Sequence, residues 1–163
     1  MEKYIRRGAN GLNYWLFKTE PNTYSIDDLA NEPDQTTCWE GIRNYAARNH
    51  LRDGVKLGDQ VLIYHSVVRP PSIVGVAEVV KEAYPDHFAF DPENPYYDAK
   101  SDKANPRWVM VDVKFVRKFS NPVSLDQVKV TEGLEEMVLV KISRLSIQPV
   151  TKAEWEIVNA LGK

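Results

Sequence analysis

The segment between residues 108 and 119 limits the possible folds more than any other part of the chain. Its residues alternate between apolar and polar, and Asp112 and Lys114 fall on the polar face. The apolar face would carry Val109, Val111, Val113 and Phe115. Successive side chains of a strand point to opposite faces, so this pattern predicts a β-strand that is buried on one side. A chain with such a strand needs a sheet packed against a hydrophobic core.

Further segments have the composition of strands and supply the rest of that sheet. They lie at residues 14–17, 60–66, 73–83 and 145–148. The middle two segments are rich in Val, Ile and Tyr and flank Arg69-Pro70-Pro71-Ser72, which predicts a hairpin. Residues 84–106 contain several prolines, aspartates and asparagines, so we expect a long irregular loop there.

Short helices are predicted where a Ser or Thr side chain can cap a first helical turn. The capping pairs are Ser25 with Asp28, Ser124 with Gln127, and Thr151 with Glu154. Residues 44–52 form another helical pattern, which Gly54 ends. Strands interrupted by short helices, without the regular alternation of a parallel sheet, favour a compact α+β fold built on a mixed β-barrel.

The length and charge of the chain exclude several classes of protein. A chain of 163 residues suits one domain, which we place at residues 13–163 behind a flexible tail at residues 1–12. The 21 basic and 23 acidic residues leave a net charge of −2, so phosphate contacts are not expected to dominate binding. Cys38 is the single cysteine, and no apolar run is long enough to cross a membrane. We expect a cytoplasmic protein, or a nuclear one in a eukaryote, that is monomeric and has no membrane contact.

The sequence carries no motif for a metal, a cofactor or a catalytic nucleophile. The histidines are scattered, and the glycines match neither the Walker nor the dinucleotide-binding spacing. His65 and Ser66 are adjacent in a predicted strand and would point to opposite faces, so they cannot easily pair as base and nucleophile. We therefore interpret His65 as a core or pocket-lining residue and expect no cofactor, no metal and no enzymatic activity.

Polar residues gather instead in short runs whose composition suits recognition of a nucleic acid. The runs are Lys18–Pro21, Trp39–Asn44 and Arg144–Ser146. The indole of Trp39 offers a flat face on which a base can stack, and Arg43 and Asn44 can meet the hydrogen-bonding edge of that base. Gly41 would let the backbone approach closely. By composition alone, a core tryptophan is the favoured interpretation of Trp39.

A basic stripe follows these runs and suggests a path for the phosphate backbone. Arg48, Arg52 and Lys56 recur every four residues, so at least the first two should share a helical face. We take Arg48 and Arg52 as candidate phosphate contacts. A solvated face explains the same pattern equally well.

Several segments together resemble the EVE domain, in order along the chain from Asn13 to Leu161. They are Lys18–Pro21, Trp39–Tyr45, Ala47–Asn49, Tyr64–Ser66, Glu82–Asp86 and Arg144–Pro149. The resemblance implies a PUA-like fold, related to the YTH readers of methylated adenine in RNA. It also implies that the protein binds a nucleic acid, DNA or RNA, through a modified base.

The resemblance further implies a base pocket, with Trp39 as one wall and Lys18 and Thr19 as its polar lip. The residues that would complete this pocket are Arg43, Asn44, His65, Ser66, Pro85, Arg144 and Ser146. The family usually has Ser at the position of Thr19, and the hydroxyl is retained here. After His65 and Ser66 the family commonly has Asn, whereas Val67 stands here, so a contact made by that amide would be missing.

Two other functions remain open beside a non-catalytic reader. An enzyme acting on modified nucleotides or RNA could use His65 as a titratable group within the pocket. A protein-interaction module could instead use the aromatic residues Tyr96, Tyr97 and Trp108 as an adhesive surface.

Overall fold

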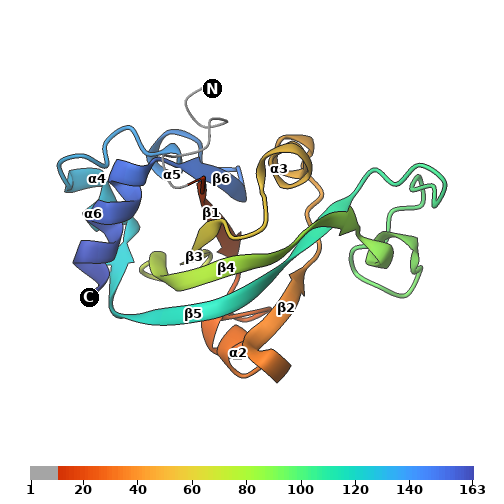
Figure 1. The fold of residues 1–163 in the computed structure, drawn as a ribbon, viewed down its shortest axis with the longest axis horizontal. Coiled ribbons are helices and arrows are strands. Elements are labelled where there is room, and N and C mark those ends of the chain that lie inside the picture. Colours follow the sequence, from red (N-terminus) through yellow and green to blue (C-terminus); the bar gives the residue numbers. More distant parts are fainter. Residues whose placement is uncertain (1–10) are drawn as a thin grey trace.

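The computed structural model describes residues 11–163, which form a six-stranded mixed sheet surrounded by short helices (Figure 1). The strands are β1 (Tyr14–Thr19), β2 (Thr36–Trp39), β3 (Gln60–His65), β4 (Ser72–Pro85), β5 (Val109–Ser124) and β6 (Ile147–Val150). Their order across the sheet is β2-β5-β4-β3-β1-β6, in which β1 and β3 are parallel and the other neighbours are antiparallel. The helices are α2 (Ile26–Ala30), α3 (Tyr45–Asn49), α4 (Leu125–Val130), α5 (Val138–Lys141) and α6 (Lys152–Gly162).

The sheet is open, so the barrel expected from the sequence is wrong. Strand β2 pairs with β5, strand β6 pairs with β1, and within residues 11–163 no pairing joins β2 to β6. Each of these edge strands is only four residues long. Closing a sheet requires its two edges to run alongside one another with a matching stagger, which these short, separated edges do not provide. The α+β class is confirmed.

Most elements form where the sequence predicts them. Strands β3 and β4 make the expected hairpin, and the capping boxes at Ser25 and Thr151 are both formed. The helix predicted over residues 44–52 divides into α3 and a π-helical turn at His50–Gly54. Strand β6 begins at Ile147 rather than Leu145, and β2 and α5 have no counterpart in the sequence-based prediction.

Both faces of the sheet are buried, and β1 shows this most directly. Trp15 and Phe17 belong to one hydrophobic cluster, whereas Tyr14 and Leu16 belong to a second. Helix α6 packs on the second cluster through Val158. Because side chains on both faces of β1 are fixed in a core, the end of this strand is a rigid support for the polar residues that follow.

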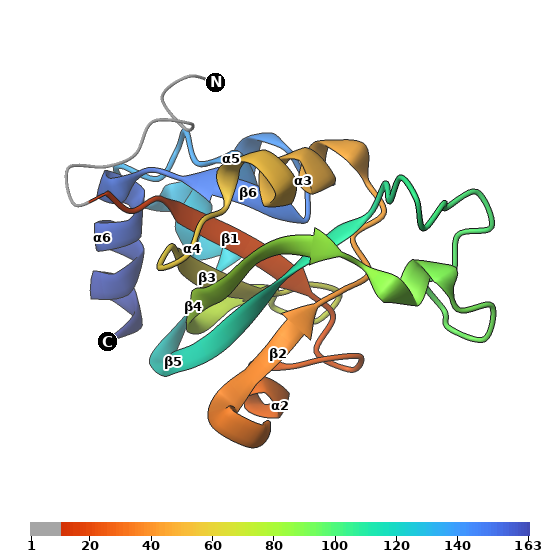
Figure 2. The same cartoon turned by 45° about the vertical axis from the view of Figure 1, so that its right-hand side comes forward.

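The connection between β4 and β5 projects from one end of the sheet, away from α4 and α6 (Figures 1 and 2). It begins with a 3-10 helix at His87–Phe90, so the loop expected over residues 84–106 is not wholly irregular. The backbone N–H of Asp86 donates to the carbonyl of Trp108 at 2.9 Å. This bond keeps β4 and β5 together at the point where the connection leaves them.

Two expectations concern the ends of the chain and its surroundings. The tail predicted at residues 1–12 lies outside the described residues, apart from Gly11 and Leu12. No helix within residues 11–163 is long and apolar enough to span a membrane. The single domain at residues 13–163 stays a prediction.

Candidate functional site

A cavity of about 610 Å³ opens where β1, β2 and β3 end. Its lining residues are Lys18, Thr19, Glu20, Thr23, Tyr24, Thr37, Cys38, Trp39, Glu40, Gly41, Ile42, Ser66, Val67, Tyr96, Ser143, Arg144 and Ser146. Main-chain bonds at the end of β1 bring distant segments to this place. The N–H of Lys18 donates to the carbonyl of Ser146, and the N–H of Ser66 donates to the carbonyl of Thr19, each at 2.9 Å.

Five of the polar residues that the family resemblance assigns to the base pocket line this cavity. Lys18, Thr19, Ser66, Arg144 and Ser146 all line it. The Lys18 Nζ donates to the carbonyl of Ser143 at 2.7 Å, and burial lowers the pKa of this amine. The Thr19 hydroxyl donates to the carbonyl of Tyr24 at 2.7 Å. Its oxygen still has lone pairs that can accept a hydrogen bond from a ligand.

Trp39 is both a core residue and a wall of the cavity. Its exposed fraction is 7%, and it belongs to the first hydrophobic cluster. Its ring centroid lies 5.6 Å from that of Phe17 and 6.2 Å from that of Tyr24. Trp39 can therefore be both a core residue and a stacking surface, because one part of the indole packs inward while another part borders the cavity.

Four residues expected in the pocket do not line it, because each side chain is used or placed elsewhere. The Asn44 Oδ1 accepts from the N–H of Ala47 at 3.0 Å and caps α3. The His65 Nε2 accepts from the N–H of Ile26 at 3.1 Å, and burial lowers the pKa of this histidine. Pro85 is exposed at the end of β4. Arg43, the fourth, is bound to an aspartate beside the cavity.

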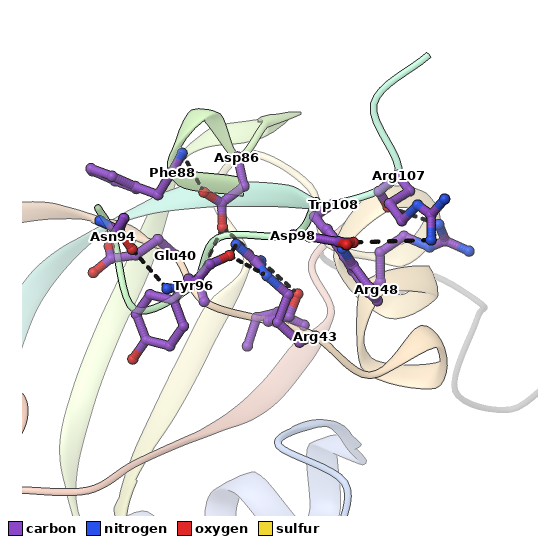
Figure 3. Close-up of polar contacts among 12 residues, drawn as sticks. Glu40, Arg43, Arg48, Asp86, Phe88, Asn94, Tyr96, Asp98, Arg107 and Trp108 are labelled. Atoms are coloured by element: carbon purple, nitrogen blue, oxygen red, sulfur yellow. Dashed lines mark hydrogen bonds and ion pairs between the residues drawn. The ribbon is translucent and has the colours of Figure 1, made fainter. Parts of the chain in front are cut away.

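The Arg43 side chain joins the β2–α3 connection to the long connection that follows β4 (Figure 3). Its Nη1 contacts the Asp86 carboxylate at 3.0 Å, and its Nε and Nη2 donate to the carbonyl of Tyr96 at 3.0 and 2.7 Å. The Asp86 side chain is fully buried. It also accepts from the backbone N–H groups of Gly41 and Phe88. The guanidinium therefore faces the protein and positions Tyr96.

Tyr96 is a wall of the cavity that the sequence does not place there. Its ring contacts Gly41 so closely that a Cβ at Gly41 would lie 2.6 Å from it. Gly41 also has a φ of 84°, which other residues rarely adopt. The close approach expected at Gly41 is thus made by a tyrosine of this chain. Tyr24 and Glu40 also line the cavity without having been assigned to the pocket. Glu40 lies within the predicted Trp39–Asn44 run, whereas no local sequence signal marks Tyr24.

The predicted phosphate contacts have partners within the protein. Arg48 donates to the carbonyl of Arg107 at 2.8 Å, and its guanidinium lies 4.9 Å from the ring centre of Tyr45. Arg52 forms an exposed ion pair with Asp53 at 2.8 Å. Neither residue lines the cavity. Their contact with phosphate stays a prediction.

The adhesive aromatic surface considered as an alternative is not formed as expected. Trp108 is only 6% exposed, stacks on Tyr45 and donates its indole N–H to Asp98 at 2.7 Å. Tyr96 is a cavity wall. Of the three aromatic residues, Tyr97 alone is exposed, with an exposed fraction of 43%.

The chemistry available in the cavity suits binding. Burial raises the pKa of the Cys38 thiol to about 12, so this side chain is protonated near neutral pH. No group of three His, Cys, Asp or Glu residues in the described part of the chain is arranged to hold a metal ion. The cavity is lined by aromatic faces, hydrogen-bond donors and carboxylate acceptors.

Known proteins share both the sequence pattern and the fold of this chain. The family model for the EVE domain matches residues 13–161. Thymocyte nuclear protein 1 of Rattus norvegicus is 45% identical over 171 residues, which covers 94% of this chain and 75% of the relative. The structure of a hypothetical protein from Leishmania major aligns with a TM-score of 0.89 and 42% identity, covering 95% of this chain and 97% of that one.

A further solved structure is the human THYN1 protein in complex with DNA containing 5-methylcytosine. It aligns with a TM-score of 0.89 and 43% identity, covering 93% of this chain and 98% of that chain. The match of the family model and the identity to full-length relatives lead to one assignment: this chain belongs to the EVE domain family.

Proposed function

We propose that the protein is a non-catalytic reader of DNA whose cavity accepts a single modified base, with 5-methylcytosine as the first candidate. The observation that carries the proposal is the cavity, in which the aromatic walls Trp39 and Tyr96 lie beside both hydrogen-bond donors and hydrogen-bond acceptors. The human relative bound to 5-methylcytosine DNA supports the choice of ligand. The base would leave its stack, enter between these walls and be held without any covalent step.

The polar groups of the cavity complement the edge of a cytosine. The exocyclic amino group of cytosine is a donor, and a carboxylate such as that of Glu40 is a suitable acceptor. The ring nitrogen and carbonyl of the base are acceptors, which Lys18, Arg144 or the Ser146 hydroxyl can meet as donors. Thymine has a carbonyl in place of the amino group and would face the same carboxylate unfavourably.

The expected affinity for an isolated nucleoside is modest. Stacking contributes about 1–3 kcal/mol per base, and extruding the base from a duplex costs a few kcal/mol. We expect a Kd in the micromolar to millimolar range, on the order of 4–8 kcal/mol of binding free energy. One methyl group against a fitted wall contributes roughly 1–3 kcal/mol of discrimination.

The direct test is calorimetric titration with 5-methyl-2′-deoxycytidine, followed by the same titration with thymidine. Glu40→Gln should weaken binding of the cytosine nucleoside by about 1–3 kcal/mol and reduce its preference over thymidine. Glu20→Gln is the matched control, because Glu20 also lines the cavity but is exposed. Equal effects of the two substitutions, or no binding by the unchanged protein, would contradict the proposal.

Binding to a longer strand should add contacts with phosphate. We propose Arg48 as such a contact, because it lies in α3 beside the exposed ring of Tyr45. Arg48→Ala should then flatten the dependence of log Kd on log salt by about one unit of slope. Arg52 is a weaker candidate, since Asp53 already pairs with it. A titration with RNA of the same sequence would show whether the 2′-hydroxyl is tolerated.

The alternative of an enzyme is addressed by a turnover assay with modified nucleosides. His65 was the candidate base, but its Nε2 already accepts a backbone hydrogen bond and does not reach the cavity lining. Product in excess of protein would end the reader proposal. We further propose a monomer, located in the nucleus if the source is a eukaryote, as the name of the vertebrate relatives suggests. A cytoplasmic location has no support.

A further inference from the structure

Val67 has an unusual backbone conformation at the rim of the cavity. Its φ is 58°, in the left-handed region, and it is one of the residues that line the cavity. A β-branched residue is a genuine outlier in that region, because its branched Cβ crowds the following carbonyl. Such strain persists only where the surrounding structure imposes it, and it is concentrated at functional sites.

The loop that carries Val67 is tied down at both ends. The N–H of Ser66 donates to the carbonyl of Thr19, and the N–H of Leu125 donates to the carbonyl of Pro71, each at 2.9 Å. The hydroxyl of Ser72, which is buried, donates to the carbonyl of Pro70 at 3.1 Å. The two prolines restrict the backbone further. A short, anchored loop of this kind holds its side chains at a fixed position relative to the cavity.

Val67 is also exposed to solvent, with an exposed fraction of 76% for the residue. A single exposed valine is ordinary on a protein surface. An exposed valine that is also strained and also borders the cavity is not explained by folding, since the core gains little from it. The exposed side chains of Arg69 and Arg144 provide positive charge on the same loop and on the cavity lining.

We propose that Val67 is an apolar wedge that enters the base stack of duplex DNA as the neighbouring base moves into the cavity. The inference rests on the proposed function and adds the form of DNA that the site acts on. A base that leaves a duplex leaves a gap, and an apolar side chain inserted between base steps compensates for the lost stacking. Arg69 and Arg144 would neutralise phosphates beside the opened step.

The test compares duplex DNA, single-stranded DNA and the free nucleoside, each containing 5-methylcytosine. Val67→Asn removes the apolar side chain, and asparagine tolerates the left-handed conformation. This variant should therefore fold more favourably, by on the order of tenfold in the folding constant. Val130→Asn is the matched control, since Val130 is 84% exposed at the end of α4 and does not line the cavity.

Because Val67 also lines the cavity, the introduced amide can change binding of all three ligands, so the wedge is tested by the difference between them. We expect Val67→Asn to weaken binding of the duplex by about tenfold relative to its effect on binding of the single strand and of the nucleoside. Val130→Asn should change none of the three affinities. An equal loss on duplex and single strand would show that Val67 is only a cavity wall, and no loss on the duplex would also overturn the wedge. If the unchanged protein binds neither the nucleoside nor the single strand, the proposed function itself fails.

Discussion

The ion pair between Arg43 and Asp86 offers the sharpest test of how the cavity is built. The Asp86 side chain is fully buried, and that of Arg43 is 22% exposed. In Arg43→Ala the carboxylate would keep its bonds from the N–H groups of Gly41 and Phe88. It would lose the guanidinium that balances its charge, and the carbonyl of Tyr96 would lose both of its Arg43 donors.

The burial of this ion pair determines how much stability the Arg43→Ala variant should lose. Removing one partner of a buried ion pair costs about 3–5 kcal/mol, because a charge is left without compensation in a poorly solvated place. Arg43 is partly accessible, so water can replace some of its contacts and the lower end, about 3 kcal/mol, is expected. This is a large part of the roughly 5–15 kcal/mol by which a domain is usually stable. The Arg43→Ala variant should still fold, but its unfolding midpoint should lie at a clearly lower urea concentration than that of the unchanged protein.

Urea denaturation followed by tryptophan fluorescence measures the effect, since Trp39 lies close by in the chain. A double-mutant cycle uses the single variants Arg43→Ala and Asp86→Ala together with the double variant. We expect an interaction free energy of about 0.5–3 kcal/mol between the two side chains. Arg52→Ala is the matched control, because it breaks an arginine–aspartate pair of similar length at the surface. It should leave the midpoint almost unchanged. Additive single effects, or an equal loss in Arg43→Ala and Arg52→Ala, would refute the reasoning.

Two further predictions concern groups whose pKa values burial shifts. Burial lowers the pKa of folded His65, so as pH falls the unfolded chain takes up its proton first. The free energy of unfolding should therefore be higher above about pH 6.5 and should decrease as pH falls below it. His65→Gln should flatten the pH dependence of the urea midpoint between about pH 7.5 and 5. Cys38, with a pKa of about 12, should be alkylated by iodoacetamide at least tenfold more slowly than free cysteine, as mass spectrometry would show. Labelling at the rate of free cysteine would contradict this.

The elements that could be predicted from sequence are those specified locally. The capping boxes at Ser25 and Thr151 require residues only three positions apart, and both form. The alternation of β5 correctly identifies its buried face through Val111 and Val113. Strand β2 escapes such reasoning because it is four residues long and is defined by pairing with β5, far along the chain.

The site was harder to predict because side chains near a cavity also have structural roles. Arg43 and Asn44 follow Trp39 directly, and their polarity suggests recognition. In the structure one neutralises a buried carboxylate and the other caps a helix. Tyr96 reaches the cavity through a hydrogen bond to a residue 53 positions away. No local pattern encodes a contact of this range.

The internal bonds around the cavity have a consequence for its affinity. The Lys18 Nζ is held by Ser143, the Thr19 hydroxyl by a neighbouring carbonyl, and Tyr96 by Arg43. These bonds form when the chain folds, so little ordering is left for the moment of binding. A single base contributes only a few kcal/mol, and a cavity that had to order its walls would lose most of that. Arg43 therefore acts on binding through Tyr96, and loss of the arginine should weaken nucleoside affinity as well as stability.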